Sequence, residues 1–405
     1  MNHRKAIQPR LARVGLLIWP KLMRGVAIVF ILTTNGLALA AASFQGLGDL
    51  SGGVFQSGAN AVSGNGQVVV GASMSASGEE AFYWTAGGGI VGLGDLPGGI
   101  FGSSANAVSA DGSVIVGNSQ SSSGVEAFRW TTDTSMTGLG DLPGGNFRSS
   151  ANGITADGSI IVGTGRADTG REAFRWTAND GMVGMGFPPF LPSGPDPWST
   201  GLGISADGSV VVGAGNDIAA NSNAAYRWTE ATGMVYLGVL PHDAHAPSSR
   251  TVAASADGSV VIGSSTSETS GPPGDQAFRW TESEGLVGLG FLPGPIWEYY
   301  NRATAVSASG SVIVGISDAA ISEQAFLWTE RHGIRSLQDV LITDLGLDLT
   351  GWTLTEATGI SADGLTIVGT GINPSGDTEA FIVTLPEPGT IALIALGLPA
   401  LFRRR

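Results

Sequence analysis

The 405-residue sequence predicts an all-β fold, a seven-bladed β-propeller with four strands in each blade. A motif typified by ANAVSADGSVIVG recurs in seven copies, and a repeat of 40–50 residues with strand-forming composition is typical of propeller blades. Glycine supplies 63 residues while lysine and glutamate are scarce, which favours short strands and tight turns over long helices. The last copy lacks a fourth strand, and the segment before the first copy supplies one.

Strands A and B, the first two of each unit, flank a turn that is usually Asp-Gly. Such a pair between two apolar runs predicts a tight hairpin, because the turn needs a positive φ at both central residues. The turn glycines lie 46 to 54 residues apart. They are Gly66, Gly112, Gly158, Gly208, Gly258, Gly310 and Gly364.

Strand C carries the motif EAFRWT. Its tryptophan recurs in six units, which predicts packing inside the blades rather than ligand binding: Trp84, Trp130, Trp176, Trp228, Trp280 and Trp328. An arginine precedes four of them and either pairs with an acidic group between blades or faces solvent: Arg129, Arg175, Arg227 and Arg279. Strand D, similar to GMVGLGDL, is expected at residues 89–96, 135–142, 181–188, 233–240, 285–292 and 333–341.

The two ends of the repeat array predict a closed ring. The seventh unit has strands A, B and C, the last at residues 380–385, and then runs directly into Pro386. Residues 44–50 have the sequence of a strand D with no blade before them. Pairing this N-terminal strand with the last blade closes the ring and removes exposed strand edges.

Residues 1–42 are predicted to be a secretory signal peptide. Six basic residues precede an apolar run over residues 25–42, and small residues around Ala40 and Ala42 form the expected cleavage region. A transmembrane anchor is the alternative. Thr33, Thr34 and Asn35 interrupt the run, which is also short for a span of about 20 residues.

Residues 386–405 are predicted to be a sorting segment. Pro386, Glu387 and Pro388 precede an apolar stretch of 14 residues, expected to form a short membrane helix, and the chain ends in three arginines. The propeller then comprises residues 43–385. A plain C-terminal anchor is the alternative, although the stretch is marginal for a full span.

Both parts resemble known families. The tail resembles the PEP-CTERM sorting signal of Gram-negative bacteria, which implies processing near the motif by an exosortase, transient anchoring in the inner membrane and delivery to the cell surface or beyond. The repeats resemble the HAF family of extracellular repeats through LGDLPGG, SADGSVIVG and EAFRWT, over nearly all of residues 44–385. Agreement weakens at residues 181–188 and in the last unit, which lacks the tryptophan. That family implies no particular chemistry.

Charge and cysteine content exclude several functions. The chain has no cysteine, so it has no disulfide, thiol nucleophile or thiolate metal site. The net charge is −14, and setting aside the six N-terminal basic residues and the +2 of the tail leaves about −22 on the propeller, which has no lysine. An acidic body of this kind repels phosphate backbones, so nucleic-acid binding is not expected.

The longer, variable loops predict a binding face. The loops that connect strand B to C and strand D to the next A should share one face, opposite the uniform A–B turns. Trp198, Trp297, Tyr299 and Tyr300 lie in these loops outside the repeat pattern and could stack on sugar rings beside Asp196 or Glu298, as could Phe190. The alternative is that these aromatic side chains pack over the ring.

No catalytic, metal or cofactor site is evident. His242 and His245 have a metal-ligand spacing, but no third ligand is apparent, and the Asp-Gly turns lack the oxygen ligands of a calcium loop. The sequence therefore favours an exported, non-enzymatic surface or matrix protein that binds polysaccharide or protein on its variable face. A propeller-fold polysaccharide hydrolase or lyase is the alternative, and two carboxylates converging near the channel would favour it.

Overall fold

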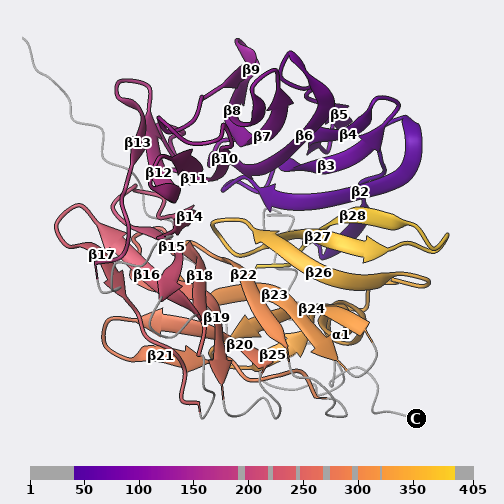
Figure 1. The fold of residues 1–405 in the computed structure, drawn as a ribbon. Coiled ribbons are helices and arrows are strands. Elements are labelled where there is room, and N and C mark those ends of the chain that lie inside the picture. The colour runs from indigo at the N-terminus through magenta and orange to yellow at the C-terminus, as the bar shows by residue number, and fades with distance from the viewer. Residues whose placement is uncertain are drawn as a thin grey trace, which may run out of the picture. The chain divides into compact units, whose positions relative to one another are not determined.

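The computed structural model describes residues 41–189, 197–217, 222–242, 247–267, 274–293, 300–319 and 322–387, which belong to one compact unit. Within these residues the chain forms 28 strands arranged in seven four-stranded antiparallel sheets. The predicted seven-bladed propeller is confirmed (Figure 1).

Six blades are built from consecutive strands A to D. The first comprises β2 (Gly52–Val62), β3 (Val69–Ser75), β4 (Gly78–Thr85) and β5 (Gly89–Gly92). The second blade comprises β6 (Gly98–Val108), β7 (Ile115–Ser121), β8 (Gly124–Thr131) and β9 (Ser135–Gly138), and the third comprises β10 (Ser150–Ile154), β11 (Ile160–Ala167), β12 (Gly170–Thr177) and β13 (Gly181–Gly184). The fourth comprises β14 (Ser199–Ile204), β15 (Val211–Asp217), β16 (Ser222–Thr229) and β17 (Gly233–Tyr236), and the fifth comprises β18 (Ser249–Ala254), β19 (Val260–Ser267), β20 (Gly274–Thr281) and β21 (Gly285–Gly288). The sixth comprises β22 (Asn301–Val306), β23 (Val312–Ala319), β24 (Ser322–Thr329) and β25 (Gly333–Ser336).

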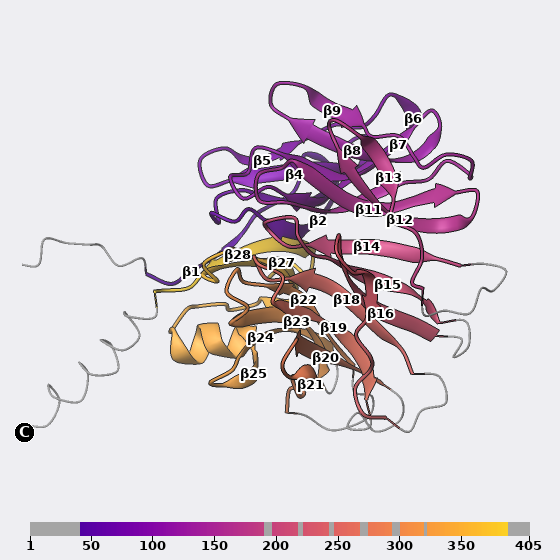
Figure 2. The ribbon, with the colours of Figure 1, turned by 90° about the vertical axis from the view of Figure 1, so that its left-hand side faces the viewer.

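The seventh blade joins the two ends of the repeat array. It consists of β26 (Thr353–Ile360), β27 (Thr366–Ile372), β28 (Thr378–Thr384) and, as its outer strand, β1 (Ser43–Gly46). Ser43 pairs with Thr384 and Gly46 with Phe381, and Figure 2 shows β1 beside β28. The Glu379 carboxylate also accepts a hydrogen bond from the Gly48 backbone N–H at 2.9 Å. The predicted closure by the N-terminal strand is confirmed.

The A–B turns form a second closure, made of backbone hydrogen bonds between neighbouring blades. In each blade one turn N–H donates to a turn carbonyl of the next blade at 2.9–3.3 Å. The series starts at Asn65, whose N–H donates to Ala110, and ends where the N–H of Ala362 in the seventh blade donates to Gly64 in the first. Every blade is therefore linked to both neighbours near the propeller axis.

The A–B hairpins form as predicted, but their turn geometry differs from the expectation. Glycines such as Gly112 have a positive φ, whereas none of the preceding aspartates does. The aspartate instead organises the turn with its side chain. Asp111 accepts hydrogen bonds from Ser109 Oγ at 2.7 Å and from the Ser113 N–H at 2.9 Å, and Ser109 Oγ accepts one from the Val114 N–H.

These turns should make the protein sensitive to acid. Their hydrogen bonds lower the pKa of Asp111 and of Asp257 to about 2, and also lower the pKa of Asp157 and Asp207. A pKa that is lower in the folded state contributes stability above the unfolded value of about 3.9, and this contribution is lost as the pH falls toward about 2. The thermal midpoint of Asp111→Asn should therefore fall less steeply than that of the wild type between pH 5 and pH 2.

The first blade offers an internal precedent for that variant. Asn65 occupies the position equivalent to Asp111 and accepts the same kinds of hydrogen bond, from Ser63 Oγ and the Gln67 N–H. The replacement should therefore fold normally at neutral pH. Identical midpoint curves for wild type and Asp111→Asn across the acid range would contradict the assigned role of this carboxylate.

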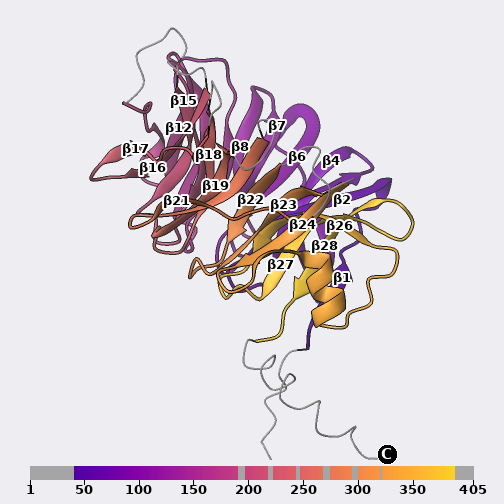
Figure 3. The same ribbon diagram turned by 90° about the horizontal axis from the view of Figure 1, so that it is seen from below.

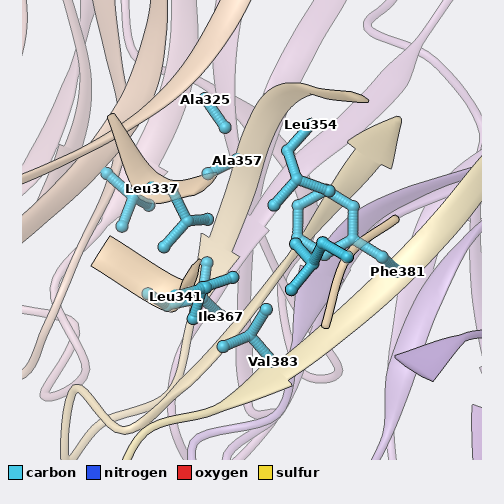
Figure 4. Packing of buried hydrophobic residues seen from close by; sticks show 10 residues of the cluster. Ala325, Leu337, Leu341, Leu354, Ala357, Ile367, Phe381 and Val383 are labelled. Carbon is cyan, nitrogen blue, oxygen red and sulfur yellow. The ribbon is translucent and has the colours of Figure 1, made fainter. Parts of the chain in front are cut away.

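The D strands are shorter than predicted. They end before the GDL sequence because Gly94, Gly140 and the equivalent glycines have a positive φ, which turns the chain out of the strand. The expected strand over residues 333–341 ends at Ser336. It continues as the helix α1 (Leu337–Asp339) and the π-helical turn η2 (Val340–Asp344), whose Leu337 and Leu341 are buried in the core shown in Figure 4.

Hydrophobic clusters fill the spaces between adjacent blades. The aromatic residue two positions before each motif tryptophan, such as Phe128 or Phe174, is fully buried. The tryptophans pack against the same clusters, but only Trp84 is buried and the others are half-buried. Packing of the tryptophans between blades is confirmed. Phenylalanine supplies most of the buried aromatic core.

The motif arginines do not all follow one of the two expected patterns, pairing with an acidic group between blades or facing solvent. Arg279 pairs with Glu284 of its own blade. The Arg227 guanidinium lies 5.9 Å from the centroid of Trp280 in the next blade, and its Nε donates to the Gly258 carbonyl. These side chains therefore have local structural partners.

The chain enters and leaves the propeller on one face. Because Ser43 pairs with Thr384, β1 begins and β28 ends on the side that carries the A–B and C–D turns, called here the turn face (Figure 3). The B–C and D–A loops lie on the opposite side, the loop face. Pro386 is buried and Glu387 exposed, whereas Ala40 and Pro388 lie outside the described residues. Within the described ranges, no helix is long and apolar enough to cross a membrane.

Candidate functional site

The loop face carries three cavities near the propeller axis. Each is lined by strand A residues and by the adjoining ends of strands B and C. They follow one another around the axis: the first spans the third to fifth blades, the second the fourth to seventh, and the third the seventh, first and second. The first and second share Arg250 and Asn223, and the second and third share Glu356.

The first cavity has a volume of about 550 Å³ and is lined by four arginines, Arg148, Arg166, Arg171 and Arg250. They come from distant parts of the sequence: Arg148 precedes β10, Arg166 lies on β11, Arg171 on β12 and Arg250 on β18. Arg166 and Arg171 occupy directly opposed positions in the β11–β12 pair. The packing of neighbouring blades around the axis therefore brings four arginines to one cavity.

Asp141 and Trp198 help to position three of these arginines, Arg148, Arg166 and Arg171. The Asp141 carboxylate accepts hydrogen bonds from the backbone N–H of Arg148 at 2.6 Å and of Arg166 at 2.8 Å. Trp198 lies 4.2 Å, ring centroid to guanidinium carbon, from Arg171, and the backbone N–H of Trp198 donates to the Asn216 side-chain oxygen. The backbone at Arg148 and Arg166 and the side chain of Arg171 are therefore held before any ligand binds.

The arginines influence one another electrostatically. Partial burial lowers the pKa of Arg171, and the positive charges of Arg166, Arg250 and Arg148 lower it further. Arg250 is accessible to solvent within the cavity, yet the surrounding walls remove part of its hydration and lower its pKa, with a smaller contribution from Arg302. The ion pairs found among the described residues involve other arginines, Arg279 and Arg335.

The second cavity, of about 380 Å³, combines acidic and basic groups. Burial raises the pKa of Asp275 and of Glu356, while Arg302 opposes the shift in both. Burial also raises the pKa of Tyr300, whose ring centroid lies 5.0 Å from the Arg302 guanidinium carbon. Arg302 Nε is buried and has no hydrogen-bond partner among the described residues.

The third cavity, of about 340 Å³, is acidic. Glu79 and Glu356 line it, together with Met74 and several hydroxyl-bearing side chains, and it contains no arginine. The three cavities therefore form a sequence around the loop face that is basic, then mixed, then acidic.

The predicted aromatic site is placed in part. Trp198 lines the first cavity and Tyr300 the second, so the structure places them in adjoining cavities rather than in one. Trp297, Tyr299, Phe190, Asp196 and Glu298 lie outside the described residues. Trp198 packs against the Arg171 guanidinium, so part of its ring already contacts protein.

Sequence reasoning missed the arginines. The position just before the first repeat residue of strand A changes from blade to blade: Gly58, Ser104, Ser150, Thr200, Arg250, Arg302 and Glu356. Its neighbours in the strand repeat, and all of these residues except Gly58 and Ser104 line the first or second cavity. Variation at this repeat position was a signal for Arg250 and Arg302, whereas Arg148, Arg166 and Arg171 lie at other positions.

The candidate histidine site gains no support. His242 Nδ1 is buried without a hydrogen-bond partner in the described part of the chain, and His245 lies outside it. No group of three or more histidine, aspartate or glutamate side chains suited to a metal is found in the ranges that the structure covers.

Comparisons with known proteins support the fold alone. No family model matches the chain, and no curated protein matches it. Among solved structures it is similar to oligogalacturonate lyase in complex with manganese (TM-score 0.51, 12% identity, 87% of this chain and 98% of that one) and to a prolyl endopeptidase (TM-score 0.51, 11% identity, 85% and 50%). TolB from Acinetobacter baumannii also matches (TM-score 0.43, 13% identity, 66% of this chain), and the match spans 62% of its length. The two likenesses with a TM-score of 0.51 support the propeller fold and nothing beyond it.

Proposed function

We propose that the protein is an exported, non-enzymatic cell-surface or matrix protein that binds polysaccharide on its loop face. The observation that carries this proposal is the first cavity, of about 550 Å³, where Trp198 and Arg171 adjoin hydroxyl and amide side chains such as Thr164 and Asn223. Sugar-binding sites commonly combine an aromatic ring with a few convergent polar groups. A protein ligand on the same face is the competing possibility.

The position of the chain ends is compatible with export and sorting. The signal peptide and the PEP-CTERM-like tail would both leave from the turn face, beside Ser43 and Thr384. The cavities lie on the opposite face, so a propeller anchored through its tail would direct them away from the membrane. This arrangement suits a protein that meets its ligand outside the cell.

A glycan array on residues 43–385 tests the binding proposal. We expect Trp198→Leu to weaken glycan binding at least about tenfold, because it removes the ring that supports Arg171. Tyr236→Leu, on the outermost strand β17, removes an exposed aromatic ring outside all three cavities and should bind normally. Absence of any glycan binding by the folded wild type would contradict the proposal.

Processing of the tail needs a separate test on the full chain. In a bacterium that contains an exosortase, alanine at Pro386, Glu387 and Pro388 should leave the C-terminal segment attached. Mass spectrometry of the exported protein would show this directly. Cleavage of the triple variant at the wild-type position would contradict sorting through this motif.

A polysaccharide hydrolase or lyase is the second candidate, favoured by one observation. Asp275 and Glu356 line the same cavity, and burial raises the pKa of both, which suits a carboxylic acid that transfers protons. The same glycans would be incubated with wild type, Asp275→Asn and Glu356→Gln. Turnover that either variant abolishes would establish the enzyme and reject a purely binding role.

A further inference from the structure

We infer that the ligand of the first cavity is an acidic polysaccharide, whose carboxylate or sulfate groups pair with Arg148, Arg166, Arg171 and Arg250. This inference deepens the proposed function and rests on it, because it specifies the class of glycan that the loop face binds. It follows from how positive charge is distributed over the protein, how the arginines are held and what else lines the cavity.

The distribution of positive charge is uneven. The predicted mature propeller has no lysine and eleven arginines in a body with a net charge of about −22. Four of those arginines line the first cavity, and Arg302 lines the adjoining one. Five of the eleven arginines therefore lie at two adjoining cavities of a lysine-free body, where they create a local positive potential that attracts anions.

The arrangement of these arginines is unfavourable without an anion. Like charges directly opposite each other on paired strands repel, and Arg166 faces Arg171 across the β11–β12 pair. The partial burial of Arg171 adds a loss of hydration. In the described part of the chain no carboxylate forms an ion pair with any of the four. A bound anion would offset both effects and could accept two parallel hydrogen bonds from each guanidinium.

The Asp141 carboxylate beside this cavity is already engaged by backbone N–H groups. The Asp141 side chain accepts backbone hydrogen bonds from Arg148, Arg166 and Leu142, so it supports the loop that presents the arginines. Asp141 therefore leaves the guanidinium groups of Arg148 and Arg166 available to a ligand. Trp198, by contrast, contacts the guanidinium of Arg171 directly, through its ring.

The remaining lining favours a sugar polymer over a nucleic acid. Ser150, Asn152, Thr164, Thr200 and Asn223 offer hydroxyl and amide groups that can exchange hydrogen bonds with sugar hydroxyls. The first cavity adjoins the second, with which it shares Arg250 and Asn223, so a chain of several sugars on the loop face could extend toward Arg302. Outside the cavity the negative body would repel a nucleic acid and an acidic polysaccharide alike, so the hydroxyl and amide lining is what favours the sugar polymer.

Affinity for defined polymers tests the inference. Residues 43–385 would be titrated with polygalacturonate, with neutral dextran and with single-stranded DNA. We expect tight binding of polygalacturonate that weakens steeply as salt rises from 50 to 500 mM, and no measurable binding of the other two. Arg171→Gln with Arg250→Gln should weaken polygalacturonate binding at least about a hundredfold, since each charge-assisted contact is worth about tenfold or more.

A matched pair of arginines provides the control. Arg129→Gln with Arg175→Gln removes the same charge from two strand C positions that line none of the three cavities, and should change the affinity less than threefold. Arg171→Lys with Arg250→Lys keeps the charge but loses the paired hydrogen bonds, and should bind between the wild type and the glutamine variant. Thermal midpoints would confirm that all variants are folded.

The possible failures are distinguishable. Binding of dextran that the arginine changes leave intact would overturn the acidic ligand and leave polysaccharide binding standing. Preference for DNA over polygalacturonate, or equal losses in the cavity and control variants, would also overturn the inference. Failure to bind any glycan on the array or in these titrations would overturn the proposed function itself.

Discussion

Deleting residues 43–50 should lower the thermal midpoint of the propeller by about 10 °C or more. The deletion removes β1, the strand that completes the seventh blade, and exposes the edge of β28. It also removes Leu47, which is buried between the last and first blades, and Phe44, which packs edge-on against Trp352 at a centroid distance of 5.0 Å. Two such side chains together contribute about 3–6 kcal/mol, before the lost strand pairing is counted.

The control for this deletion is removal of residues 388–405, which lie outside the described residues. That truncation should leave the midpoint within about 2 °C of the full-length value. Differential scanning calorimetry on the two truncations separates loss of ring closure from loss of chain length. Equal midpoints for both would contradict the role assigned to β1.

Replacing Phe128 with alanine should destabilise the protein by about 3–5 kcal/mol. The side chain is fully buried in the cluster between the first and second blades, where Val70, Leu93 and Ile115 surround it. Its removal leaves a cavity that rigid strands on both sides cannot fill. Chemical denaturation of the wild type and variant measures the difference.

Trp130→Ala is the natural comparison, two residues further along the same strand. Trp130 packs against the same cluster but is only half-buried, so part of its surface already contacts water. Its loss should cost less than that of Phe128, about 2–3 kcal/mol. A larger loss for Trp130 than for Phe128 would mean that the tryptophan, rather than the phenylalanine, dominates the core between the blades.

The fold could be predicted because its signals are local and repeated. The spacing of the turn glycines specified the blades, and the strand-like sequence of residues 44–50 specified how the ring closes. The errors arose where a side chain or one glycine decides the geometry. Asp111 organises its turn by accepting hydrogen bonds rather than by adopting a positive φ, and Gly94 ends a strand that the apolar pattern would continue.

The helix after Ser336 was missed for a related reason. Residues 337–341 were assigned to strand D by analogy with the other units, yet Leu337 and Leu341 are four positions apart and both are buried. This spacing places both side chains on one face of a helix. The analogy with neighbouring repeats outweighed that local signal.

The candidate site could be predicted only as a face. Loop length and variability indicated which side of the ring differs from blade to blade, and the three cavities lie there. The arginines themselves are 102 residues apart in sequence, from Arg148 to Arg250, and no spacing rule connects them. Their proximity comes from the way neighbouring blades meet around the axis, which requires the tertiary structure.

A single engineered disulfide tests the circular pairing most directly. Gln45 and Ile382 are directly opposed in β1 and β28, a geometry that brings Cα atoms to about 4.5–5.5 Å and permits a disulfide. Because the chain has no cysteine, Gln45→Cys with Ile382→Cys would form one unambiguous bond. Closure predicts near-complete intramolecular oxidation of this pair, and little oxidation of Gln45→Cys with Thr137→Cys on the distant strand β9. The reverse result, or equal oxidation of both pairs, would contradict the closed ring.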